Sequence, residues 1–163
     1  MNAAKAMGAS MVVAVDWDNT YRMDLAKDLG ADLVLGKDDD VIACILAATE
    51  GRGVDNSCEF SGAASALSNA IHSTRMGGYV NVLSVYGEGT AEVPMNEVVF
   101  RYLHVHGING RKMWSTWDTM HELLEAGAIA VDKIITHRMG IDAFDRAVPL
   151  AMEGNCGKVV LDF

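Results

Sequence analysis

The sequence predicts an α/β fold built on a mostly parallel, doubly wound sheet. Short apolar, β-branched runs alternate with amphipathic stretches of about ten to fifteen residues, the pattern of repeated βαβ units. Runs such as Met11–Val15 are continuously apolar, which is typical of a strand buried on both faces of a parallel sheet. Right-handed crossovers between such strands place helices on both faces of the sheet.

Most of the expected strands are short runs rich in apolar residues. The run Leu103–Ile108 differs because polar and apolar residues alternate in it, so we expect it at a sheet edge. In chain order the expected strands are Met11–Val15, Ala31–Leu35, Val54–Phe60, Tyr79–Val85, Leu103–Ile108, Ile134–Arg138 and Lys158–Phe163.

The expected helices show apolar residues at helical spacing. Gly8 and Gly30 end the first two as C-cap residues, and the Gly77–Gly78 pair is interpreted as the turn that ends the fourth. In chain order the expected helices are Asn2–Met7, Thr20–Leu29, Asp39–Thr49, Ala63–Met76, Asn96–Phe100, Trp114–Ala126 and Ile141–Glu153.

Length and composition indicate one globular domain over residues 1–163. Half of the residues are hydrophobic and the net charge is −9, which disfavours binding to nucleic acid or to an anionic membrane. No run reaches the length of a membrane span, and no signal peptide is recognisable at the start. Cys44, Cys58 and Cys156 are odd in number and form no CxxC motif, so a reducing cytoplasm is expected.

Residues directly after strands are the candidates for binding, because parallel sheets bind ligands at the carboxyl ends of their strands. Asp16 follows the first strand, where an acid can accept hydrogen bonds from a ribose; equally, such an acid can simply cap the next helix. Ser61 lies in the segment Glu59–Gly62, where a glycine allows a ligand to come close to the backbone. The alternative is an ordinary strand-to-helix turn with Ser61 near an N-cap position.

Four further candidates follow the next two strands. Leu83 and Ser84, and then Ile108 and Asn109, could line a pocket through backbone groups, or they could be plain apolar strand ends. His104 and His106 share one face of a strand, but no third ligand of a suitable type stands nearby, so we expect no metal site. The sequence contains no nucleophile elbow, Walker loop or HExxH motif.

The order of segments resembles the medium-chain, zinc-dependent alcohol dehydrogenase family, and within it the threonine dehydrogenases first and the sorbitol-type polyol dehydrogenases next. The resemblance covers nearly the whole chain and rests on VVAVD, YRMDLAKDLGAD, VDNSCEFSGA, MGGYVNVLSV, VHGINGRKMWSTW, IITHRMGIDAFDRAV and GNCGKVVLDF, in that order. It implies a Rossmann-like domain and an NAD-dependent oxidation of a secondary alcohol assisted by zinc.

The resemblance also assigns roles to individual residues. It implies that Asp16 binds the adenosine ribose and that Arg22 packs beside the adenosine, although Arg22 follows Asp16 by one residue more than the family spacing. It further implies that the nicotinamide side of the cofactor is contacted by Leu83, Ser84, Ile108 and Asn109.

The chain departs from the family in what it does not contain. The first strand with its GxGxxG turn, and the domain that carries the zinc ligands, would precede Met1. We therefore expect a truncated NAD-binding domain that is inactive alone, with residues 134–163 returning toward the absent catalytic domain. Binding of NAD by this portion is expected to be weak or absent. The alternatives are a residual nucleotide-binding or interaction module, such as one chain of a split dehydrogenase, or a different enzyme such as a nucleotide-dependent transferase.

The absent first strand would lie at the centre of the sheet in the strand order 3-2-1-4-5-6. Because unpaired backbone groups in a buried sheet cost free energy, we expect the gap to be filled. Strand exchange with a second copy, or a rearrangement that uses Lys158–Phe163, would fill it, and the expected edge strand Leu103–Ile108 also favours a homo-oligomer.

Overall fold

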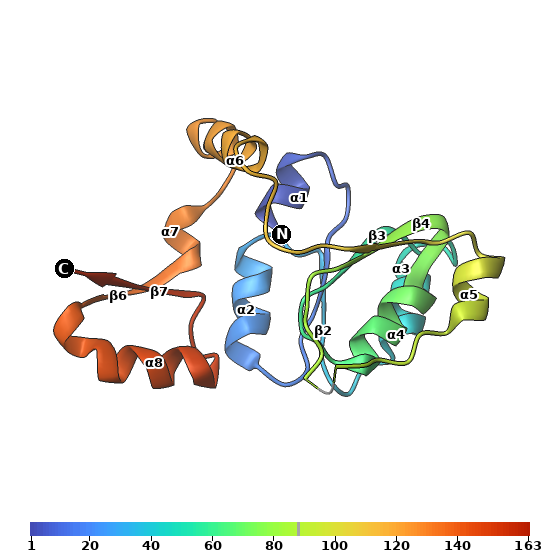
Figure 1. Cartoon of the computed structure of the whole chain (residues 1–163), viewed down its shortest axis with the longest axis horizontal. Helices are drawn as coiled ribbons and strands as arrows, with labels where there is room; N and C mark the ends of the chain where they lie inside the picture. The colour runs from blue at the N-terminus through green and yellow to red at the C-terminus, as the bar shows by residue number, and fades with distance from the viewer. Residues whose placement is uncertain (88) are drawn as a thin grey trace. The chain divides into compact units, whose positions relative to one another are not determined.

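The computed structural model describes residues 1–87 and 89–163 and confirms the predicted α/β class (Figure 1). Every strand pair is parallel: β1 with β2, then β3, β4 and β5 in that order, and β6 with β7. The chain divides into two compact units. Unit 1 comprises Met1–Asp39 together with Met113–Phe163, and unit 2 comprises Asp40–Lys112.

The first part of unit 1 is a parallel strand pair with two helices. The α2 helix begins where it does because the Asn19 side chain accepts a hydrogen bond from the Arg22 amide at 2.9 Å. The elements are α1 (Asn2–Ala6), β1 (Val13–Val15), α2 (Thr20–Asp28) and β2 (Leu33–Leu35).

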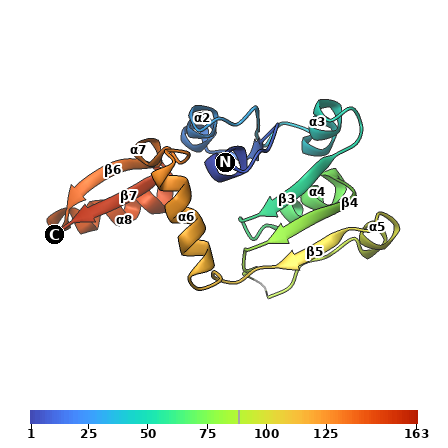
Figure 2. The same cartoon turned by 90° about the horizontal axis from the view of Figure 1, so that it is seen from above.

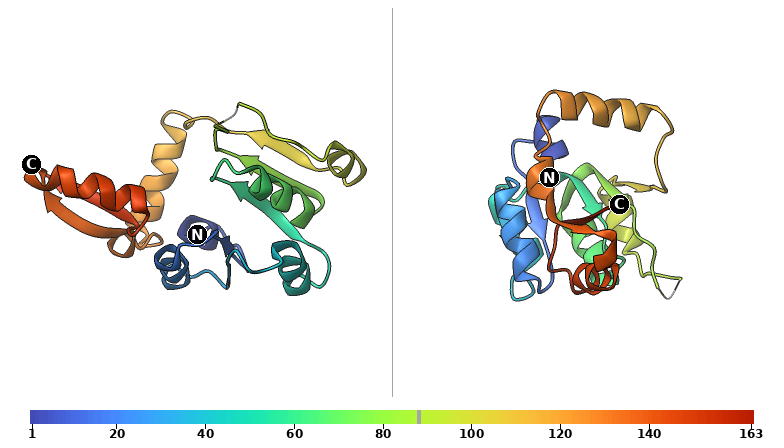
Figure 3. Two further views of the ribbon diagram at one scale, coloured as in Figure 1. Left: turned by 90° about the horizontal axis from the view of Figure 1, so that it is seen from below. Right: turned by 90° about the vertical axis from the view of Figure 1, so that its left-hand side faces the viewer.

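The second part of unit 1 contains the helix α8 beside the β6–β7 pair (Figure 3). Its elements are α6 (Ser115–Glu125), α7 (Val131–Ile134), β6 (Ile135–Gly140), the 3-10 turn η1 (Ile141–Ala143), α8 (Phe144–Glu153) and β7 (Lys158–Asp162). The α8 helix ends at Gly154, whose φ is +76°, and the Asn19 amide group donates to the Gly154 carbonyl at 3.1 Å. This bond ties the end of α8 to the start of α2.

Unit 2 is a three-stranded parallel sheet with helices packed on it (Figure 2). Its core is formed by Leu67, Ile71, Val80 and Leu103. The β5 strand lies at the edge of the sheet, as its alternating pattern predicts. The elements are α3 (Val41–Ala48), β3 (Val54–Glu59), α4 (Ala64–Ser73), β4 (Thr74–Val82), α5 (Met95–Phe100) and β5 (His104–Gly107).

The predicted end of the α4 helix at Met76, with a turn at Gly77–Gly78, is wrong. The helix ends at Ser73, and β4 begins at once at Thr74 and runs through both glycines. Gly78 serves strand packing instead, because a Cβ there would lie 3.0 Å from the Asp55 carbonyl oxygen of β3.

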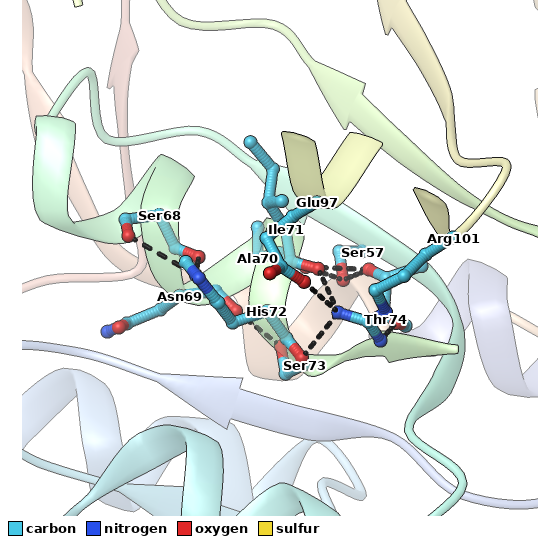
Figure 4. A network of polar contacts seen from close by, with 10 residues as sticks. All are labelled: Ser57, Ser68, Asn69, Ala70, Ile71, His72, Ser73, Thr74, Glu97 and Arg101. Atoms are coloured by element: carbon cyan, nitrogen blue, oxygen red, sulfur yellow. Dashed lines mark hydrogen bonds and ion pairs between the residues drawn. The ribbon is translucent and has the colours of Figure 1, made fainter. Parts of the chain in front are cut away.

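Tertiary contacts explain the early end of α4 (Figure 4). The Arg101 guanidinium donates to the carbonyls of Ile71 at 3.2 Å and His72 at 3.1 Å, and also to the carbonyl of Thr74. The Thr74 hydroxyl donates to the Ala70 carbonyl at 2.6 Å. These donors satisfy the carbonyls that a helix end leaves open, so the helix can stop without a glycine cap.

One edge of β1 in unit 1 and one edge of β3 in unit 2 have no paired strand among the described residues. In the predicted strand order β1 and β3 flank the absent strand, and among the described residues β1 pairs with β2 and β3 pairs with β4. The terminal strand β7 pairs with β6, so this single chain shows no rearrangement of Lys158–Phe163. Strand exchange with a second copy stays a prediction. No helix in the described part of the chain is long and apolar enough to cross a membrane.

Candidate functional site

The candidate residues of unit 1 meet at a hollow of about 290 Å³ beside β1 and α2. Asp16 and Arg22 both line it, so the structure brings together the two residues assigned to the adenosine side. The rest of the lining is largely apolar and comprises Met1, Ala14, Val15, Met23, Leu25, Ala26, Leu29, Val34, Cys156 and Gly157.

Asp16 follows β1 and is half-buried. Its amide donates to the Leu35 carbonyl at 3.1 Å, which holds the residue against β2. One carboxylate oxygen, Oδ1, accepts from the Asn19 amide at 3.3 Å, but the residue that caps α2 is Asn19, so Asp16 does not itself cap the helix. The other oxygen, Oδ2, has no hydrogen-bond partner among the described residues, so it is available to a ligand in the hollow.

Arg22 lies in the first turn of α2, six residues after Asp16. Its guanidinium lies against the end of α8, because a Cβ built on Gly154 would be 3.0 Å from the Arg22 Nη2 atom. Arg22 still lines the hollow, although it follows Asp16 by one residue more than expected.

The candidates of unit 2 meet at one edge of its sheet. Glu59, Val82 and Gly107 are aligned across β3, β4 and β5, so the three strands end side by side. The backbone hydrogen bonds between strands continue past their ends. The Leu83 amide donates to the Glu59 backbone carbonyl at 3.0 Å, and the Ile108 amide donates to the Val82 backbone carbonyl at 2.8 Å. We call the residues that follow these ends the strand-end edge: Ser61, Leu83, Ser84, Ile108 and Asn109.

A buried carboxylate lies at this edge and forms what we call the Glu59 cluster: Glu59, Ser61, Gly62, Ser84 and Tyr86. Glu59 is only 3% exposed. Its Oε1 accepts from the Ser61 amide at 2.6 Å, the Ser61 hydroxyl at 2.6 Å and the Gly62 amide at 3.0 Å. Its Oε2 accepts from the Ser84 hydroxyl and from the Tyr86 hydroxyl at 3.0 Å.

Hydrogen bonds rather than a cation stabilise the charge of Glu59. Burial alone would raise the pKa of Glu59, but hydrogen bonds from Ser61, Ser84 and Tyr86 outweigh it and hold the pKa below its ordinary value. Burial and the neighbouring carboxylate raise the pKa of Tyr86. Among the described residues, Tyr86 is the titratable group that hydrogen-bonds Glu59, and no ion pair includes this carboxylate.

Sequence reasoning singled out Ser61 and Ser84 but not the two residues that join them, Glu59 and Tyr86. A signal for Glu59 was present, because an acid that closes a buried strand just before Ser-Gly needs hydrogen-bond donors. Tyr86 carries no comparable local signal, because its contact with Glu59 spans 27 positions of the chain.

His104 and His106 lie on the exposed strand β5, next to Tyr79 of β4. Tyr79 stacks on His104 with ring centroids 4.6 Å apart and meets His106 edge-on at 5.5 Å. Within residues 1–87 and 89–163, no group of three or more His, Cys, Asp or Glu side chains could hold a metal ion. The residues present therefore do not fit the zinc that the resemblance implies.

The described residues fit parts of NAD. The hollow offers a carboxylate oxygen beside apolar side chains, which suits an adenosine ribose, and the strand-end edge offers backbone groups between apolar residues. The 163 residues contain no GxGxxG segment for the pyrophosphate.

Comparison with known proteins finds relatives that match nearly the whole chain. The family model described as zinc-binding dehydrogenase matches residues 1–126. The L-threonine 3-dehydrogenase of Bacillus licheniformis is 40% identical over 159 residues, which are 97% of this chain and 46% of that protein. The L-threonine 3-dehydrogenase of Pyrococcus abyssi is 39% identical over 160 residues, 96% of this chain and 45% of that protein.

Solved structures agree at the level of the fold. The 2R,3R-butanediol dehydrogenase of Bacillus subtilis superposes with a TM-score of 0.89 at 29% identity, covering 99% of this chain and 46% of that one. The alcohol dehydrogenase of Thermus sp. ATN1 superposes with a TM-score of 0.88 at 24% identity, covering 98% of this chain and 46% of that one. The chain thus spans less than half the length of the relatives it matches.

Proposed function

The chain belongs to the zinc-binding dehydrogenase family, and we propose that it is the NAD-binding portion of a secondary-alcohol oxidoreductase of the threonine dehydrogenase type. The observation that supports this proposal best is the placement of Asp16. It ends the first strand of the chain, lines an apolar hollow, and keeps one carboxylate oxygen without a protein partner among the described residues.

An acid in this place favours NAD over NADP. The carboxylate can accept hydrogen bonds from both ribose hydroxyls, whereas the 2′-phosphate of NADP would bring a second negative charge against it. Arg22 lines the same hollow, and its residue type is the one cationic type among the described lining residues.

The strand-end edge would hold the nicotinamide end. A nicotinamide held there would supply the hydride acceptor for oxidation of the alcohol. The described residues provide positioning for this step, but they provide no metal site and no acid–base relay that we can assign. We therefore propose that the 163-residue chain does not turn over threonine by itself.

A second candidate function is an interaction module, such as one chain of a split dehydrogenase. The apolar side of α6 favours it, because Trp117 is 53% exposed and Met120 and Leu124 are each 41% exposed. Exposed apolar faces of this kind are typical of surfaces that bind another protein.

Isothermal titration calorimetry tests the NAD proposal. We expect wild type to bind NAD more tightly than millimolar and NADP more weakly, and Asp16→Asn to lose about tenfold or more in NAD affinity, because a hydrogen bond to a charged group contributes about 1.5–3 kcal/mol. Asp38→Asn is the matched control, since it removes the same charge from an exposed position in unit 1. Equal losses in the two variants, or no binding by wild type, would refute the proposal.

Turnover is tested separately. Threonine, NAD and zinc are mixed with the purified chain, and NADH is followed by its absorbance. We expect NADH to form no faster than in the protein-free control. Turnover by the pure chain would show that it carries a complete active site.

A further inference from the structure

The Glu59 carboxylate joins two turns that are far apart in sequence. Three of its five hydrogen bonds come from the turn after β3, through Ser61 and Gly62. The other two come from the segment after β4, through Ser84 and Tyr86, which are 25 and 27 positions away. One buried side chain thus fixes the ends of two neighbouring strands.

The backbones of these two turns also touch directly. Gly62 has a φ of +76°, and a Cβ at this position would lie 2.7 Å from the Val85 carbonyl oxygen. Such a distance excludes any side chain at position 62 unless the turns separate. The geometry of the edge therefore depends on both the glycine contact and the carboxylate at Glu59.

The serine hydroxyls of the edge are committed to Glu59. A hydroxyl has one hydrogen to donate, and those of Ser61 and Ser84 are both directed to the carboxylate. The Ser61 oxygen in addition accepts from the Ala63 amide at 3.2 Å. What these two serines can offer a ligand is therefore a backbone group and not a side-chain hydrogen. At Ser61 that group is the carbonyl, because the Ser61 amide also donates to Glu59.

We propose that Glu59 is a positioning residue of the cofactor edge, whose carboxylate turns the Ser61 and Ser84 hydroxyls inward so that the strand ends present backbone groups to the nicotinamide. The identity of the ligand rests on the proposed function; the internal positioning does not. Glu59 itself does not touch the cofactor, because both of its oxygens are occupied by protein donors.

The first test measures the positioning without any cofactor. In Glu59→Gln we expect amide hydrogen exchange at Ser61 and Gly62 to be about tenfold faster than in wild type, because bonds to a neutral acceptor are weaker. In wild type the proton shifts of these two amides should move as Glu59 titrates at acid pH, and in Glu59→Gln that movement should vanish. Glu92→Gln is the control, since Glu92 is exposed in the same unit.

The second test measures NAD affinity in a double-mutant cycle of Glu59→Gln and Ser84→Ala. We expect each single variant to weaken NAD binding, Glu59→Gln by about tenfold, and the double variant to bind no more weakly than Glu59→Gln, because Ser84 acts through Glu59. Additive losses of NAD affinity would show that Ser84 and Glu59 affect NAD binding independently, which contradicts the proposal.

The outcomes separate this proposal from the proposed function. Unchanged amide exchange in Glu59→Gln, or a Ser84→Ala loss of NAD affinity that persists fully in the Glu59→Gln background, overturns the positioning role. Absence of NAD binding by wild type overturns the proposed function instead, and the amide measurements still decide whether Glu59 fixes Ser61. If Glu59→Gln does not fold, Tyr86→Phe replaces it, because it removes one hydroxyl from the carboxylate and keeps the ring; unchanged shift titration there also counts against the proposal.

Discussion

Replacing the Glu59 carboxylate with an amide should destabilise unit 2 in a manner that depends on pH. Glutamine has the same shape and can still accept at one oxygen, so packing is retained. The bonds at stake are the five that converge on the carboxylate. A hydrogen bond to a charged group contributes about 1 kcal/mol more than a neutral one, which sets an upper limit of about 5 kcal/mol.

The net effect should be smaller than that limit. The five donors share a single charge, and removing the charge also removes its cost of burial, which opposes the loss. We expect Glu59→Gln to lower the free energy of unfolding of unit 2 by about 1–2 kcal/mol at pH 7.

The sign of the pH dependence follows from the pKa of Glu59. The folded-state pKa lies below the unfolded value of 4.5, so this carboxylate stabilises the fold above pH 4.5, and the contribution is lost as the pH falls through the folded pKa. The difference in stability between wild type and Glu59→Gln should therefore be constant from pH 7 to about pH 5 and shrink at lower pH.

Native-state hydrogen exchange measures the free energy of opening of unit 2 in wild type and in Glu59→Gln. The amides of Ile71 and Val80, two buried core residues, report its opening. Tryptophan fluorescence reports unit 1, because Trp17, Trp114 and Trp117 all lie outside Asp40–Lys112. A stability difference that stays the same from pH 7 to pH 3, or no difference at pH 7, would refute the reasoning.

Two further variants test the helix ends. Arg101→Met removes the donors to three carbonyls at the end of α4 and should lower stability by about 2–4 kcal/mol in thermal unfolding followed by circular dichroism, whereas exposed Arg146→Met should change it by less than about 0.5 kcal/mol. Gly154→Ala should destabilise more than Gly127→Ala in urea unfolding: both have positive φ, but only at Gly154 would the new Cβ meet a side chain, 2.6 Å from the Asn19 Nδ2 atom. Equal effects within either pair would show that these contacts do not matter.

The alternation of strands and helices could be predicted from the sequence, because it depends on the local spacing of apolar residues. Continuous apolar runs such as Met11–Val15 fit only a few architectures, and a parallel sheet follows once helices separate them. The prediction failed at Gly77–Gly78, where two glycines look like a turn. The deciding contact there is tertiary, since Arg101 reaches the end of α4 from a distance of more than 25 positions.

The candidate site shows the same division between local and distant information. That Ser61, Ser84 and Asn109 follow neighbouring strands could be predicted, because parallel strands end at one edge. Which atoms of these residues face a ligand could not, because the orientation of both serine hydroxyls depends on Glu59 and its burial.

Asp16 and Glu59 are both acids at the end of a parallel strand, but they differ in their hydrogen-bond partners. At Asp16 one oxygen accepts from Asn19 and the other has no partner among the described residues, beside a hollow. At Glu59 both oxygens are saturated by protein donors and the residue is buried. An ionised carboxylate takes its hydrogen bonds from the protein, from water or from a ligand that displaces the water. The first acid therefore suits recognition of a ligand, and the second suits the internal positioning of the residues around it.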